Sequence, residues 1–125
     1  MALTNLTKGT VVDSEGGSAT TNLAQGVSKS WINFTTVTST VAQDSFNVGS
    51  MLDFGTGYSG VVFTNNMSNN DYSKTMSAGG GSYRHFADTV SHGTAFTNGY
   101  RVYVTDATTA RDCDDNQCTV HGDLA

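Results

Sequence analysis

The clearest pattern along the chain is an alternation of polar and apolar positions with a period of two in residues 27–34, which is typical of a β-strand. Ile32 and Phe34 fall on one face of this strand, and Val27 and Trp31 fall on the other. A strand with one solvated face does not need apolar residues on both faces. We therefore expect Trp31 or Phe34 to lie near a contact between copies of the chain.

A second alternating run covers residues 45–54, and apolar residues resume at 58–63. The sequence Gly55-Thr-Gly57 separates the two runs. Glycine accepts the positive φ that tight hairpin turns require, so these runs are predicted to form a β-hairpin.

Turn-forming Asn, Asp and Gly residues divide the rest of the chain into short segments. Further strands are expected at residues 10–13, 72–78, 100–104 and 119–124. Residues 82–93 fit either a short helical turn or an excursion, and 106–117 have the composition of a polar loop. Five to seven short strands separated by turns predict an all-β fold, a small antiparallel β-sandwich over residues 27–125. Residues 1–26 are expected to be an extended N-terminal arm, either flexible or attached to a larger assembly.

Composition excludes several classes of function. The chain has 125 residues and a formal net charge of -5, so it holds one domain and lacks the basic patch that binds nucleic acid. No apolar run approaches a membrane span, and no export signal is recognised, so we expect no membrane insertion. Hydrophobic residues make up 37% of the chain, which predicts a thin core and favours oligomerisation.

The sequence offers little for catalysis. It has no G-x-S-x-G or H-E-x-x-H motif, and the acidic run at 112–116 fails the EF-hand pattern, so no enzyme activity, metal or cofactor is expected. Cys113 and Cys118 enclose four residues. A disulfide that clips this loop, two free thiols and a metal site with Asp112 and His121 all remain open.

Tyrosines lie among Asn, Ser and Thr, a combination that suits sugar binding because a ring face packs against CH groups while polar side chains bind hydroxyls. Tyr72 and Tyr83 flank the glycine-rich segment at 79–81 and are the best candidates for exposed contacts. With Arg84 and His85 they form the predicted site of contact with a glycan.

Several stretches occur in an order that is familiar from one family. They are Gly26-Val-Ser-Lys-Ser-Trp-Ile-Asn-Phe34, Asp44-Ser-Phe-Asn-Val-Gly-Ser50, Asp53-Phe-Gly-Thr-Gly57, Val61-Val-Phe-Thr64, Met67 with Tyr72, and Tyr100-Arg-Val-Tyr-Val104. Together they resemble a β-domain common in structural proteins of tailed bacteriophages. The resemblance covers residues 26–78 well and 96–125 loosely, and it carries no catalytic motif. The chain departs from the family in lacking the usual proline, in residues 79–97 and in its cysteine pair.

The resemblance implies a virion structural protein made in the host cytoplasm, a short tail fibre or a tail-tip protein that recognises host surface glycans. The alternative is a capsid decoration protein that grips the shell through residues 1–26. A carbohydrate-binding module is the alternative from another class. The expected partners are further copies of the chain in a homotrimer, other virion proteins and a host glycan.

Overall fold

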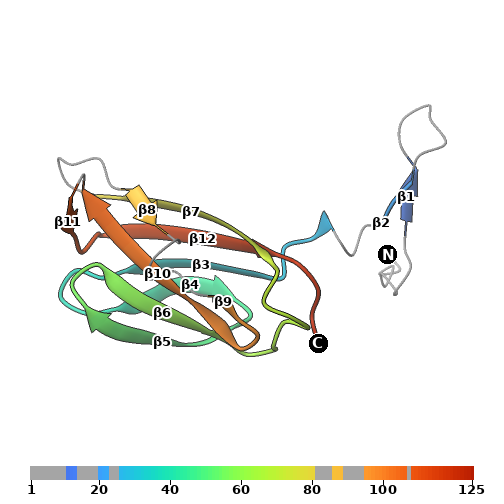
Figure 1. Cartoon of the computed structure of the whole chain (residues 1–125), viewed down its shortest axis with the longest axis horizontal. Coiled ribbons are helices and arrows are strands. Elements are labelled where there is room, and N and C mark those ends of the chain that lie inside the picture. The colour runs from blue at the N-terminus through green and yellow to red at the C-terminus, as the bar shows by residue number, and fades with distance from the viewer. Residues whose placement is uncertain (1–10, 14–19, 23–25, 81–85, 89–94, 107) are drawn as a thin grey trace, which may run out of the picture.

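The computed structural model describes residues 11–13, 20–22, 26–80, 86–88, 95–106 and 108–125 (Figure 1). All elements of these residues are β-strands. Two antiparallel sheets pack face to face, and the β-sandwich that the sequence predicts is confirmed. The strands β1 (Val11–Asp13) and β2 (Thr20–Asn22) pair with each other in a two-stranded sheet of their own.

The first sheet of the sandwich, here the β3 sheet, has four strands in the order β4-β3-β12-β7. Their bounds are β4 (Val41–Phe46), β3 (Ser30–Thr35), β12 (Asp115–His121) and β7 (Ser73–Gly79). The second, here the β6 sheet, runs in the order β11-β10-β6-β5, and β8 and β9 also pair with β10. Its strands are β5 (Val48–Gly55), β6 (Tyr58–Phe63), β8 (Phe86–Asp88), β9 (Ala95–Phe96), β10 (Gly99–Asp106) and β11 (Thr109–Ala110).

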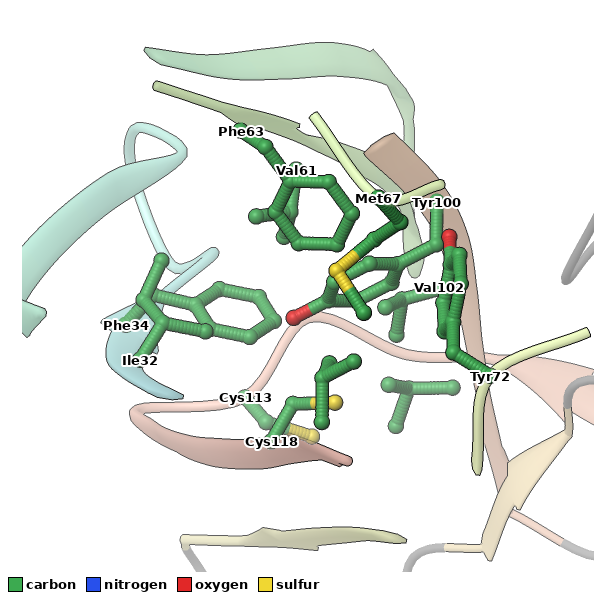
Figure 2. Close-up of a cluster of buried hydrophobic side chains, with 12 residues drawn as sticks. Ile32, Phe34, Val61, Phe63, Met67, Tyr72, Tyr100, Val102, Cys113 and Cys118 are labelled. Atoms are coloured by element: carbon green, nitrogen blue, oxygen red, sulfur yellow. The ribbon is translucent and has the colours of Figure 1, made fainter. Parts of the chain in front are cut away.

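The core lies between the two sheets and is filled by apolar side chains from both (Figure 2). The buried apolar residues are Ile32, Phe34, Val61, Phe63, Met67, Tyr72, Tyr100, Val102, Val104, Cys113, Cys118 and Val120. Figure 2 shows the rings of Phe34 and Tyr100 pointing toward each other. Burying large side chains in this way supplies most of the stability of a small domain.

The alternation predicted for residues 27–34 is confirmed from Ser30, where β3 begins: Ile32 and Phe34 point inward and Trp31 points outward. Residues 27–29 precede the strand. Phe34 is 0% exposed within a single chain, so its predicted place at a subunit contact is wrong. Its ring is packed in the core between the two sheets of its own chain. Trp31 is 37% exposed, and its place at a contact between copies stays a prediction.

The prediction of a single strand at residues 45–54 is wrong. These residues divide at Asn47 between β4 and β5, which belong to different sheets. This residue has φ of 57°, a left-handed conformation that Asn tolerates better than most residues. Its amide nitrogen donates to the carbonyl oxygens of Lys29, at 3.0 Å, and of Asn65, at 3.1 Å. Its amide oxygen accepts from the Asn65 backbone nitrogen at 2.7 Å. These bonds fix the corner where β4 ends and β5 begins.

The hairpin predicted around Gly55-Thr-Gly57 is confirmed as β5 and β6. Gly57 has φ of 67°, and a Cβ built there would lie 2.5 Å from the Val104 carbonyl oxygen, so no other residue fits. Its backbone nitrogen donates to the Asp112 carboxylate at 2.8 Å. The Asp53 carboxylate accepts from the Gly55 nitrogen at 2.8 Å. Residues 53–57 therefore serve the fold, joining the hairpin to the loop before β12.

Other predicted elements differ from the structure mainly in their bounds. The strands expected at 10–13, 72–78 and 100–104 correspond to β1, β7 and β10. The closing strand begins earlier than expected, at Asp115, and β11 lies inside the predicted loop. Within residues 82–93 the described part is the strand β8, which replaces the helical turn considered there, and the rest lies outside the described residues.

Asn47→Ala is expected to lower the free energy of unfolding by about 2 kcal/mol or more, because it removes the corner bonds and leaves alanine in a left-handed conformation. Asn47→Gly should lose less, since glycine adopts that backbone without strain. The control is Asn66→Ala, an exposed neighbour whose backbone carbonyl accepts from Ala125. Urea unfolding followed by Trp31 fluorescence measures all three. Equal effects of Asn47→Ala and Asn66→Ala would contradict this role of the corner.

Candidate functional site

The outer face of the β6 sheet carries a gap in a row of side chains from three adjacent strands. Leu52 of β5 pairs with Gly60 of β6, and Gly60 pairs with Arg101 of β10. Because glycine has no side chain, Gly60 leaves a gap between Leu52 and Arg101, and the Phe54 ring covers part of this gap, so that Gly60 itself is buried. A groove of about 270 Å³ occupies this gap. Its lining, here called the Arg101 groove, consists of Leu52, Phe54, Gly60, Val61, Val62, Phe96, Asn98, Gly99, Tyr100 and Arg101.

The guanidinium of Arg101 stands among aromatic rings at this groove. Its Cζ atom lies 5.0 Å from the ring centre of Phe54, 5.5 Å from that of Phe96 and 5.9 Å from that of Tyr58. Its Nη1 donates to the Tyr58 hydroxyl at 2.9 Å. Cation–π attraction and this hydrogen bond hold the side chain in place, so the groove presents a fixed positive charge between rings.

The aromatic walls are exposed although they are apolar. Phe54 of β5 is 43% exposed and Phe96 of β9 is 41% exposed, and both line the groove. The Phe54 ring leans over Gly60, where a built Cβ would lie 3.0 Å from the ring, and it packs at 4.9 Å on Tyr58. Clusters of exposed apolar side chains on a small domain mark surfaces that bind something. A ring face beside a guanidinium suits a ligand with a CH-rich face and polar or anionic groups.

Tyr72 supports the groove from inside the sandwich. It is only 8% exposed, and its ring packs edge-on against Phe63 at 5.7 Å. Its hydroxyl lies 2.6 Å from the Gly99 carbonyl oxygen and 3.0 Å from that of Phe96. The prediction of Tyr72 as an exposed glycan contact is therefore wrong. Its ring is buried in the core, and its hydroxyl is hydrogen-bonded to carbonyl oxygens at the β9–β10 turn. It positions two residues of the groove instead.

The other predicted glycan contacts are Tyr83, Arg84 and His85, which lie outside the described residues. Their role stays a prediction. The sequence pattern did not predict Leu52, Phe54, Phe96 or Arg101 as site residues. The available signal was the spacing of Leu52 and Phe54 by two positions, opposite a glycine in the partner strand of the hairpin.

A second surface lies on the outer face of the β3 sheet around Trp31. Trp31 pairs with Phe46 of β4 and with Thr119 of β12, and Phe46 is 51% exposed. Asn33 and Gln117 pair in the next row, and the amide oxygen of Asn33 is buried without a hydrogen-bond partner. This surface is a platform of one indole, one phenyl ring, uncharged polar groups and the carboxylate of Asp44. It has no cation comparable to Arg101 in its shallow depression.

The cysteines are both buried, and both are free thiols in the structure. Burial, and then the neighbouring Asp112 and Asp114, raises the pKa of Cys113 from 9.0 to about 11. Burial also raises the pKa of Cys118. Thiols with raised pKa values are poor nucleophiles at neutral pH. A disulfide between the two stays a prediction.

Hydrogen bonds hold the cysteine loop against the end of β3. The Thr36 nitrogen donates to the Cys113 carbonyl oxygen at 2.9 Å, and the Cys113 nitrogen donates to the Thr36 hydroxyl at 2.8 Å. The amide nitrogen of Asn116, which is 0% exposed, donates to the carbonyl oxygens of Cys113 and Phe34. These bonds clip the loop without a covalent link.

Other kinds of site are not found in the part of the chain that the structure describes. It holds no group of three or more His, Cys, Asp and Glu side chains placed to bind a metal ion. It also contains no helix with the length and apolarity needed to cross a bilayer.

Comparison with protein-family models, curated proteins and solved structures finds no match to this chain.

The free energy of unfolding is expected to fall as the pH rises above 9. Burial raises the pKa of Cys113 from 9.0 to about 11 and that of Tyr72 from 10.0 to about 12. The unfolded chain therefore releases these protons first, so the stabilisation is complete below pH 9 and is lost as the pH passes through the folded-state values.

Urea unfolding at pH 7 and pH 10, in a reducing buffer, measures this loss. Cys113→Ala should reduce the difference between the two pH values, because it removes one of the groups. Asp71→Asn, a change at an exposed side chain, serves as the control. A pH difference of the same size in Cys113→Ala and in the unmodified protein would rule out a contribution from Cys113.

Proposed function

We propose that this chain is a non-catalytic recognition module of a tailed-bacteriophage particle, in a short tail fibre or tail tip, and that it binds saccharides of the host surface through the Arg101 groove. The observation that carries the binding is the groove itself, with exposed Phe54 and Phe96 beside a held guanidinium. Aromatic faces with a few convergent polar groups are the usual means of holding a small polar ligand.

The assignment to a phage particle rests on the ordered stretches that resemble the phage β-domain. In the structure these stretches supply the strands β3, β5 and β6 and the turn between β5 and β6. The contacts of Gly57 with Val104 and Asp112 give its motif a structural reason. The resemblance therefore concerns residues that determine the fold, which supports kinship with that domain.

One observation favours the capsid decoration protein as the second candidate. The strands β1 and β2 lie within residues 1–26 and pair with each other, in a sheet separate from the two sheets of the sandwich. An N-terminal element with its own pairing suits an arm that attaches to a shell. The homotrimer fits either location, and the exposed Trp31 and Phe46 offer an apolar surface for it.

Phe54→Ala is expected to weaken binding of the labelled protein to cells of the host strain by about fivefold or more, the usual effect of losing an aromatic anchor. The matched control is Leu124→Ala, which removes an apolar side chain of the same exposure, 43%, that does not line the groove, and Phe46→Ala tests the opposite sheet. Flow cytometry over a range of protein concentrations gives the apparent affinities. Binding that survives Phe54→Ala and is lost in Phe46→Ala would assign recognition to the other face.

The location in the particle is tested separately. Purified particles should contain the chain, and gold-labelled antibodies should bind at the tail tip in electron micrographs. Label on the head, lost when residues 1–26 are removed, would favour the decoration protein. Particles from which the chain is absent by mass spectrometry would refute both candidates.

A further inference from the structure

We infer that the Arg101 groove selects saccharides that carry a carboxylate, such as uronic or sialic acid units, over neutral sugars; this inference rests on the proposed function and names its ligand class. Arg101 is the cation that lines this groove. Within the described residues Arg101 makes no ion pair, and the one ion pair found there joins Arg111 to Asp106 at 2.6 Å. The guanidinium is half-buried, with rings and one phenol as its neighbours.

A partly buried cation without a counter-charge gains from an anion that reaches it. The rings and the Tyr58 hydroxyl offset part of the lost hydration. The guanidinium has five N–H donors in a flat fork, and the Tyr58 hydroxyl accepts from Nη1. A carboxylate matches this fork with two parallel hydrogen bonds, which a neutral hydroxyl does not.

The groove also holds Arg101 ready for such a ligand. Rings of Phe54, Phe96 and Tyr58 surround its Cζ atom within 6 Å, and this packing restricts the side chain before a ligand arrives. Preorganisation lowers the entropy lost on binding. The Tyr72 hydroxyl bonds to Phe96 and Gly99 from below, so the wall that faces Arg101 is fixed to the core.

The shape of the groove suits a sugar ring. Its volume of about 270 Å³ lies just below the range typical of small-molecule sites, roughly 300–1,000 Å³. Gly60 and Gly99 contribute no side chains to it, and Phe54 and Leu52 form an apolar wall. A pyranose unit can place its CH face against that wall, its carboxylate at Arg101 and a hydroxyl near Asn98. An acidic peptide lacks the rigid CH face that packs against the wall of Phe54 and Leu52.

The negative net charge of the chain means that only short-range contacts in the Arg101 groove can attract an acidic saccharide. The chain carries a formal net charge of -5, which repels acidic polymers at long range. Binding of an acidic saccharide therefore depends on the groove, and the effect of one arginine can be separated from the effect of one unit of net charge. Arg111, already paired with Asp106, provides the matched site for that comparison.

The experiment measures binding of three acidic probes, which are oligogalacturonate, a glucuronate-containing oligosaccharide and oligosialic acid. Each is compared with its carboxyl methyl ester, which keeps the sugar and removes the charge. At least one acidic probe should bind about tenfold or more tightly than its ester, as expected for a charge-assisted hydrogen bond. Arg101→Met should abolish this preference, and Arg111→Met should keep it. Arg101→Lys, which keeps the charge without the fork, should show an intermediate preference even if Arg101→Met folds poorly.

Each other outcome overturns the inference in a distinct way. Esters that bind as well as the acids, with binding lost in Phe54→Ala, would leave the proposed sugar recognition intact and refute the selection for carboxylates. Polyglutamate that binds as tightly as the acidic saccharides would identify an acidic peptide as the ligand. Absence of binding to all six saccharide probes, combined with groove-dependent binding to host cells, would refute the carboxylate inference alone. Absence of binding to both probes and cells would refute the proposed function as well.

Discussion

The left-handed backbone at Asn47 is the constraint on which the sandwich depends. One residue with φ of 57° turns a single alternating run into two strands that belong to opposite sheets. The side chain then links this corner to Lys29 and Asn65, which precede β3 and follow β6. Four strands of two sheets are thereby brought to one place. The inner faces of β3 and β6 consequently face each other and enclose Phe34 and Phe63.

The fold class was predictable because strand alternation and hairpin turns are local. The Gly55-Thr-Gly57 turn and the faces of β3 follow from neighbouring residues alone. The break at Asn47 was not predictable in this way, since the alternation continues through it and the left-handed corner is stabilised by residues 18 positions away on either side. The hydrogen bonds that stabilise the corner at Asn47 can form only when the residues next to β3 and β6 are already in place.

The proposed binding surface was harder to predict, because a period of two separates the faces of a strand without saying which face is buried. Tyr72 and Phe54 both lie among polar neighbours in the sequence. Tyr72 is buried because carbonyl groups of Phe96 and Gly99 accept its hydroxyl, and those residues are 24 and 27 positions away. Phe54 is exposed because its strand is paired with β6 in a register that places the ring over Gly60. Both outcomes depend on long-range pairing.

The gap at Gly60 has a consequence for how this surface can diverge. A single methyl group at that position would press within 3.0 Å of the Phe54 ring and fill the hollow from its floor. The extended strand backbone allows a side chain there, and the Phe54 ring has to shift to admit one. A single substitution at Gly60 is thus enough to narrow the Arg101 groove, and it leaves the pairing of the strands unchanged. A substitution at residue 60 would therefore remove the proposed pocket while the two sheets stay paired as they are.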